Sequence, residues 1–392
     1  MSRSTSFRLL SRALIVAAVV WIAGCGEDDP VAGDVVEKQA VTLTGASSAS
    51  SVQRIVYRMP AVGGGLHDAK ALVMIPAGPA PSGGWPVLAW GHGTTGIADA
   101  CAPSATADLA GYLPYLNALV AQGYAVVAPD YEGLGTSGLH PYLSLASEGR
   151  SLVYAVLAAT RGFGSLSTRY ALIGHSQGGH AVLGAADLAG EVSGLTLVGT
   201  VAIAPASNIR ASGDQLQAVI TNNAAPIGDR VAAGVGRLLF SSLILGAIPA
   251  TDASFDPASA FGSQASSLAS AAVSQCLTDL SNTIAPLVQA EVTTNGSIDA
   301  LLPPASLNIP AVSQYLQNNE PGTRAIAKPV LLLQGSADTT VFPAFTQLLN
   351  NTMTTAGTSS SYTEFAGETH SSIVQASAAA ALAFLATSFA TP

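Results

Sequence analysis

The chain has 392 residues, of which 49% are hydrophobic and only 10% charged, and 24 Asp and Glu residues outnumber 15 Lys and Arg residues to give a net charge of −9. Such a chain is long enough to bury a large core in one domain that carries an insertion. An acidic protein with so few cations has no basic patch, so we exclude nucleic acid as its partner.

The N-terminus is predicted to be a signal peptide that spans residues 1–24. Arg3, Arg8 and Arg12 give it a positive charge, and residues 13–23 follow as an apolar stretch that is too short to cross a bilayer. We therefore exclude these residues from the fold and expect the protein to work outside the cytoplasm.

A lipid anchor is predicted at Cys25. Residues 22–25 (Ile-Ala-Gly-Cys) resemble a bacterial lipobox, in which the cysteine is lipid-modified and becomes the first residue of the mature protein. Acyl chains on this cysteine would hold the protein at a membrane, with residues 25–40 as a tether. Because Gly26 stands where an Asp would signal retention at the inner membrane, we expect a lipid-anchored protein of the bacterial cell envelope, at the outer membrane or cell surface unless it is released. The alternative is ordinary signal cleavage beside an incidental cysteine.

Short apolar runs alternate with helical patterns over the first half of the chain. The alternation predicts a mostly parallel sheet with helices on both faces, because strands covered on both sides are continuously apolar. Strands are expected at 71–76, 86–90, 125–131, 170–173 and 195–203, and helices at 112–122, 147–160 and 179–188.

The alternation stops after Pro205. Residues 208–325 are rich in Ala, Ser, Leu and Gln and are broken by prolines, which predicts several short helices and loops. The strand pattern resumes at 330–334 and 361–365, and a helix is expected at 372–389. The predicted architecture is therefore an α/β core formed by residues 41–207 and 326–392, with residues 208–325 as a helical cap or lid.

A nucleophile elbow is predicted around Ser176. Residues 174–178 read Gly-His-Ser-Gln-Gly, which matches G-x-S-x-G and stands between the strand at 170–173 and the helix at 179–188. Small neighbours let strand and helix approach and leave the serine hydroxyl exposed at the edge of the sheet. His180, on the helix that follows, is expected to point away from the elbow. The alternative is a glycine-rich turn without chemistry.

A serine nucleophile needs a base within hydrogen-bond reach and an acid that orients the base. In strand–turn–helix sites of this kind the order along the chain is Ser, acid, His. His370 lies in a loop after the last predicted strand and is the candidate base. Asp338 follows the preceding strand and is the candidate acid, with Glu368 and Asp130 as rivals.

Acyl transfer also needs donors for the oxyanion that develops on the substrate. One candidate is the backbone N–H of Gln177, which directly follows the nucleophile at the start of a helix. The other is expected from the loop at residues 91–96, from Thr94 or Thr95, since glycines there let the backbone approach a substrate. The alternative is a glycine-rich turn with a structural His92.

Besides Cys25, the chain has two cysteines, Cys101 and Cys276. Outside the cytoplasm such a pair is oxidised, so we expect a disulfide, with two separate buried thiols as the alternative. The sequence has no H-x-x-E-H motif and no Cys/His cluster, so we expect neither a metal nor a cofactor.

Several motifs occur in a fixed order along the chain. In the sequence they are GHGTTG (91–96), CAPS (101–104), APDYEGLG (128–135), GHSQGG (174–179) and GSAD (335–338), followed by His370. Together they resemble the secretory lipase family of α/β-hydrolases, the lipase A-like enzymes, over roughly residues 60–390. The chain departs from some lipases in lacking an HGGG oxyanion loop.

The resemblance implies an α/β-hydrolase core, a helical cap and hydrolysis of carboxylic esters, including acylglycerols. By position it assigns Ser176 as nucleophile, Asp338 as acid and His370 as base. We therefore expect a serine ester hydrolase whose activity rises from acetyl to at least medium acyl chains, because the predicted cap is apolar. The alternatives are an acyltransferase or peptidase on the same triad, a non-catalytic surface lipoprotein, and a cap whose apolar residues form only its own core.

Overall fold

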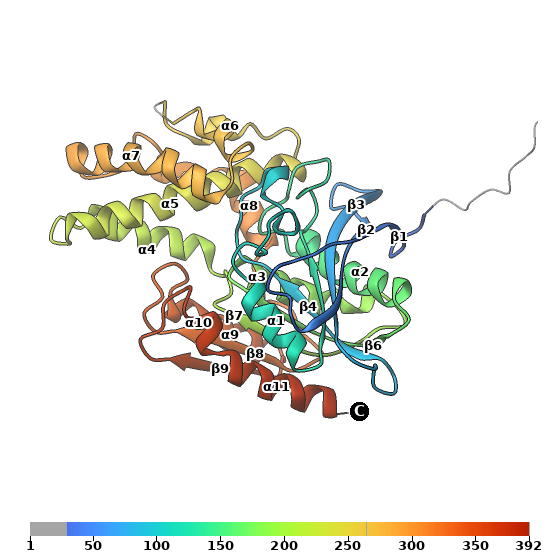
Figure 1. Cartoon of the computed structure of the whole chain (residues 1–392). Helices are drawn as coiled ribbons and strands as arrows, with labels where there is room; N and C mark the ends of the chain where they lie inside the picture. The colour runs from blue at the N-terminus through green and yellow to red at the C-terminus, as the bar shows by residue number, and fades with distance from the viewer. Residues whose placement is uncertain (1–29, 264, 392) are drawn as a thin grey trace, which may run out of the picture. The chain divides into compact units, whose positions relative to one another are not determined.

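A nine-stranded sheet organises the part of the chain that the computed structural model describes, residues 30–263 and 265–391 (Figure 1). The predicted signal peptide and Cys25 lie outside these residues. The strands are Val35–Ala40 (β1), Ala49–Pro60 (β2), Leu66–Pro76 (β3), Trp85–Gly91 (β4), Ala125–Pro129 (β5), Leu166–His175 (β6), Thr196–Ile203 (β7), Val330–Gly335 (β8) and Ser360–Phe365 (β9).

The strand order is β1-β2-β3-β5-β4-β6-β7-β8-β9. The six strands from β5 to β9 in this order pair in parallel, whereas β1, β2 and β3 join by antiparallel pairing at one edge. The predicted α/β class with a mostly parallel sheet is therefore confirmed. The carboxyl ends of parallel strands share one edge of the sheet, and this is where ligands collect in such folds.

The prediction of a tether that reaches residue 40 is wrong for its last part. Residues 35–40 form β1 and pair with β2, and Lys38 donates a hydrogen bond to the Gly162 carbonyl while its ammonium lies 4.0 Å from the centre of the Phe163 ring. Five of the six β1 residues are exposed, so the strand has no buried face and no alternation of apolar residues by which to recognise it. Backbone pairing with β2 holds it in place.

Helices cover both faces of the sheet. Leu145–Gly162 (α2), Gln177–Asp187 (α3) and Pro343–Thr355 (α9) pack on one face, and Leu113–Ala121 (α1), Ile373–Ala376 (α10) and Ala378–Ala390 (α11) pack on the other. The single helix expected at 372–389 is divided at Ser377, whose side chain is fully buried.

A second group of helices lies between β7 and β8 in the chain. They are Ile209–Thr221 (α4), Ile227–Ala247 (α5), Leu268–Ala272 (α6), Leu277–Asn295 (α7) and Pro310–Asn318 (α8), and they are called the insertion below. The yellow and orange helices α4 to α7 lie together in Figure 1, and α5 packs on α4, α6 and α7. These helices have their own hydrophobic cluster, separate from the clusters on the two faces of the sheet.

Helix α5 is the central helix of the insertion. With the turn that follows, it is long and apolar enough by composition to cross a membrane, with a mean hydropathy of 1.9, but 67% of its most apolar window is buried inside the protein. A mostly apolar helix that is largely buried against other helices is a core helix. Its burial against α4 and α7 accounts for its composition.

A disulfide joins the insertion to the core. Cys101 and Cys276 are bonded, with their Cα atoms 5.3 Å apart. Beside the bond, Gly96 forms a β-bridge with Cys276, and the Leu277 amide donates to the Thr95 carbonyl at 2.8 Å. The start of α7 is therefore held against the loop that follows β4.

Candidate active site

Ser176 occupies the turn between β6 and α3 in a strained backbone conformation. Its φ of +58° and ψ of −118° are unusual for a residue with a side chain. The turn needs the glycines two residues to either side of the serine: a Cβ on Gly178 would lie 1.9 Å from the Gly91 oxygen, and one on Gly174 would lie 2.2 Å from the Gly178 oxygen. This close approach of β4, β6 and α3 fixes the position of the serine.

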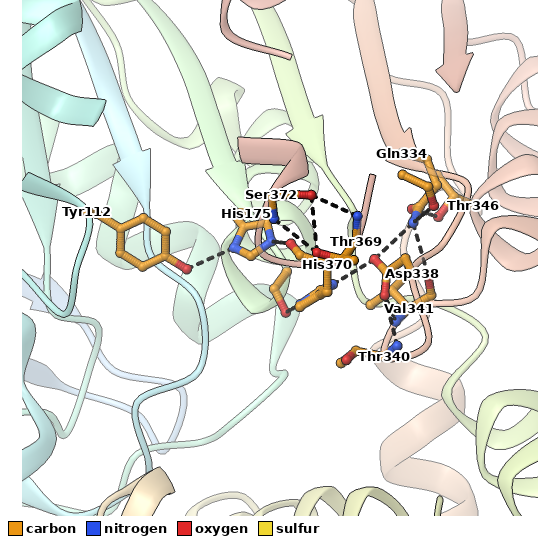
Figure 2. Close-up of polar contacts among 12 residues, drawn as sticks. Tyr112, His175, Gln334, Asp338, Thr340, Val341, Thr346, Thr369, His370 and Ser372 are labelled. Atoms are coloured by element: carbon orange, nitrogen blue, oxygen red, sulfur yellow. Dashed lines mark hydrogen bonds and ion pairs between the residues drawn. The ribbon is translucent and has the colours of Figure 1, made fainter. Parts of the chain in front are cut away.

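The three residues predicted for catalysis come together in one line of hydrogen bonds. His370 Nδ1 lies 2.7 Å from Asp338 Oδ2, and His370 Nε2 lies 2.9 Å from Ser176 Oγ. A carboxylate only accepts, so Nδ1 carries the proton and Nε2 accepts from the serine hydroxyl. Figure 2 shows His370 between Asp338 and the end of β6. This is the tautomer that a general base requires.

Asp338 is held as a carboxylate by donors on all sides. The Thr340 and Val341 amides donate to Oδ1 at 2.8 and 2.9 Å, and the Gln334 side chain donates to Oδ2 at 3.0 Å (Figure 2). Burial raises the pKa of Asp338, but the hydrogen bonds and the charge of His370 outweigh this and leave the pKa below its ordinary value. These hydrogen bonds therefore favour the charged form of the Asp338 carboxylate.

His175, the residue before the nucleophile, holds the backbone of His370. The His370 carbonyl accepts a hydrogen bond from His175 Nε2 at 2.8 Å, so Nδ1 is the acceptor for the Tyr112 hydroxyl, also at 2.8 Å (Figure 2). Burial, with the nearby His370 second, lowers the pKa of His175 to about 3. His175 is therefore neutral and acts as a bridge. No sequence pattern indicates this role, because the partners of His175 come from distant segments.

Gln177, whose amide is the first predicted oxyanion donor, directly follows Ser176. Gln177 is the first residue of α3, and the amides of a first helical turn have no partner within the helix. Of the two predicted threonines, Thr94 has its hydroxyl 2.9 Å from the Tyr142 hydroxyl, and Thr95 accepts from the amide of Leu277. Which of the two completes an oxyanion site stays a prediction.

A buried ion pair joins α3 to α2 near the start of α3. His180 donates through Nδ1 to Glu148 at 2.8 Å and through Nε2 to the Asn319 carbonyl at 2.9 Å. Burial lowers the pKa of His180, but the hydrogen bond and charge of Glu148 outweigh it and raise the pKa above its ordinary value. His180 points away from the elbow, as expected, and is a cation. Glu148, which sequence reasoning missed, also accepts from the Gln177 side chain at 2.8 Å.

The rivals named from the sequence have other partners. Asp130 is buried and accepts two hydrogen bonds from Ser104, and burial raises its pKa to about 6 despite them. His92 stacks on Tyr131 and bonds the Asp130 carbonyl at 3.2 Å. The carboxylate that bonds His370 is that of Asp338. Across residues 30–263 and 265–391, no three His, Cys, Asp or Glu side chains gather as a metal site requires.

Comparison with known proteins identifies the family of this chain. A model of the family described as secretory lipase matches residues 102–392, most of the chain. The chain belongs to the secretory lipase family. Membership makes this secretory lipase a carboxylic ester hydrolase. No match was found among curated protein sequences.

Solved structures establish the fold of this secretory lipase. A variant of the rice cell wall degrading esterase LipA from Xanthomonas oryzae is similar with a TM-score of 0.73 at 24% identity, over 92% of this chain and 100% of that one. Candida antarctica lipase A in its closed state is similar with a TM-score of 0.68 at 16% identity, over 92% of this chain and 82% of that one. The predicted α/β-hydrolase fold is thereby confirmed.

A cavity of the secretory lipase reaches Ser176. Its empty volume is about 690 Å³, including its opening to solvent. The insertion supplies most of the wall, with α4 and α5 prominent, and the core supplies the rest near the serine. Most of the lining side chains are apolar or carry hydroxyl groups, and Arg237 is the single charged residue among them.

Proposed function

We propose that this secretory lipase hydrolyses esters through an acyl-enzyme on Ser176, with His370 as general base and acid and Asp338 as its orienting partner. The observation that carries the proposal is the line of hydrogen bonds from the serine hydroxyl through the imidazole to a buried carboxylate. The strained turn and the cavity at Ser176 support it as well. Both features are typical of a serine that is presented to a substrate.

The proposed reaction has two halves. Ser176 Oγ attacks the carbonyl carbon of the ester while His370 Nε2 takes the hydroxyl proton, and Asp338 stabilises the imidazolium. The Gln177 amide, with that of Thr94 or Thr95, would hold the oxyanion. The C–O bond to the alcohol then breaks, the alcohol leaves with the proton from His370, and the acyl group stays on the serine. Water repeats the cycle and releases the acid.

We further propose that residues 41–207 and 326–392 form the catalytic core and residues 208–325 a cap over it. Support comes from the cavity wall, to which Ile209, Phe240 and Leu307 of the second segment contribute beside Ser176. Apolar side chains there would bury part of an acyl chain, at about 0.8 kcal/mol for each methylene. The cap would then contribute to substrate binding as well as cover the serine.

The family is described as secretory, which places the protein in the extracellular space or the cell envelope. We propose that it is retained there by a lipid on Cys25. The support is the sequence at residues 22–25, which resembles a lipobox after a positively charged and apolar leader.

The test of the mechanism is covalent labelling. Ser176→Ala removes the attacking oxygen, so the variant should lose both ester hydrolysis and labelling by a fluorophosphonate while its circular dichroism stays that of the wild type. Ser242→Ala is a matched control, since this serine is buried on α5 and bonds the Leu238 carbonyl instead of lining the cavity. Full labelling of Ser176→Ala would refute the assignment.

A further inference from the structure

Arg237 is a buried cation without a matching anion. It lies on α5 and is only 3% exposed. Within the described residues its Nε has no hydrogen-bond partner, and Nη1 has one long bond of 3.5 Å, to the Leu302 carbonyl. None of the ion pairs found in that part of the chain includes it. A guanidinium stays charged in proteins, and buried charges are normally paired because desolvation is costly.

The neighbouring Arg230 shows how this helix treats a buried arginine that has a structural role. Arg230 is two turns earlier on α5 and is 8% exposed. Its guanidinium donates to the Ile220 carbonyl at 2.7 Å and to the Gly296 carbonyl at 2.9 Å. It is thus well bonded and does not line the cavity. Arg237 differs from it in both respects, so its position is not explained by packing alone.

The surroundings of Arg237 suit an anionic guest. Burial lowers the pKa of Arg237. The negative charges of Asp299 and Asp214, which are exposed, raise this pKa but offset the effect of burial only in part. The cavity that it lines also holds Ser176, and none of the lining residues is acidic. Hydroxyl groups of Ser212 and Ser241 share the wall and are suitable further donors. Buried charges without partners are typical of functional positions, and this one lines the cavity that holds Ser176.

We propose that Arg237 is a specificity residue that binds a carboxylate on the substrate, so that this enzyme prefers esters whose acyl or alcohol part carries a carboxylate. The proposal rests on the proposed function, because it takes Ser176 as the reacting group. A planar guanidinium binds a carboxylate through two parallel hydrogen bonds, which a lysine does not reproduce. The pairing also removes the cost of an unpaired buried charge, which makes the bound state more favourable.

The test compares matched esters in which one carboxyl group is either free or blocked as its methyl ester. One pair carries the charge on the acyl side: the 4-nitrophenyl monoester of adipic acid and the 4-nitrophenyl ester of monomethyl adipate. The other carries it on the alcohol side: 4-carboxyphenyl butyrate and its methyl ester. We expect the wild type to have the higher kcat/KM for the anionic member of one pair, and the pair that shows it identifies the side that meets Arg237. This comparison uses the wild-type enzyme alone, so its result remains valid even if a substitution at Arg237 prevents folding.

Variants assign the preference to Arg237. In Arg237→Met the ratio of kcat/KM for the anionic ester to that for the neutral one should fall at least about 30-fold, the scale measured when one partner of a desolvated charge pair is removed. Arg237→Lys should give an intermediate ratio, because lysine keeps the positive charge but cannot donate two parallel hydrogen bonds to a carboxylate. Arg230→Met is the matched control, with the same substitution on the same helix, and should keep the wild-type ratio.

Two results would overturn the inference: a ratio that is the same in the wild type and in Arg237→Met, or a wild type that prefers the neutral member of both pairs. Hydrolysis of the neutral esters without any charge preference refutes the role of Arg237 and leaves the proposed function intact. If the wild type hydrolyses none of the four esters, the proposed function fails and this inference fails with it.

Discussion

Acid should destabilise this protein through His175, the neutral histidine that bridges Tyr112 and His370. Its pKa is lowered by burial to about 3, whereas a histidine in an unfolded chain has a value near 6.5. Between these two pH values, His175 binds a proton in the unfolded chain but stays neutral in the folded protein. The stabilising contribution of the neutral ring is therefore present above pH 6.5 and is lost as the pH falls toward 3.

The size of the effect follows from the two pKa values. Each pH unit inside the window costs about 1.4 kcal/mol of unfolding free energy, so at pH 4.5 the loss due to His175 is roughly 3 kcal/mol. Asp338 adds little there, because an unfolded Asp is protonated only near pH 4 and below, so the loss that its lowered pKa causes comes at lower pH. Asp130, whose pKa is raised by burial to about 6, titrates in the same window, so the contribution of His175 has to be isolated by comparison with a variant.

The measurement is urea unfolding of the wild type and His175→Gln at pH 7 and pH 4.5. Any packing defect of the variant is present at both pH values, so it cancels when the two differences in unfolding free energy are compared. We expect the unfolding free energy of the wild type minus that of the variant to be lower at pH 4.5 than at pH 7 by roughly 3 kcal/mol. An advantage that is equal at the two pH values would refute the reasoning.

Three further outcomes are expected. Asp338→Asn should lower kcat by about 10⁴-fold in a 4-nitrophenyl ester assay, because the imidazole loses the acceptor that fixes its tautomer, and a larger loss in Glu368→Gln would reverse the choice of acid. The double variant Cys101→Ala/Cys276→Ala should unfold at lower urea concentration, with up to about 5 kcal/mol lost for a sequence separation of 175, and an unchanged midpoint would speak against the bond. Cys25→Ser should move the protein from the membrane fraction to the soluble one, and a wild-type N-terminus that mass spectrometry finds unmodified downstream of this cysteine would rule out the lipid.

Much of the fold and of the candidate site was predictable from sequence because the signals are local. The buried parts of β6 and β8 contain continuous apolar runs. Ser176 directly follows β6, and Asp338 lies three residues after the end of β8. The strand-end position and the residue type together indicate the chemistry. The order of Ser176, Asp338 and His370 along the chain then selects the histidine.

What was missed depends on contacts between distant segments. His175 bonds Tyr112 and His370, which lie 63 and 195 residues away, and Glu148 meets His180 across 32 residues. A single sequence carries no pattern for such pairs. Strand β1 escaped prediction for another reason: its side chains are exposed, and its place depends on backbone pairing, which any residue except proline provides.

The fastening at Cys276 limits how the insertion can move relative to the core. Cys276 is bonded to Cys101, bridged to Gly96 and followed by an amide that bonds Thr95, so the start of α7 is fixed beside the loop after β4. Any rearrangement of the insertion that keeps these bonds must leave the start of α7 in place. Reduction of the disulfide removes the covalent part of this fastening and leaves the β-bridge and the backbone hydrogen bond.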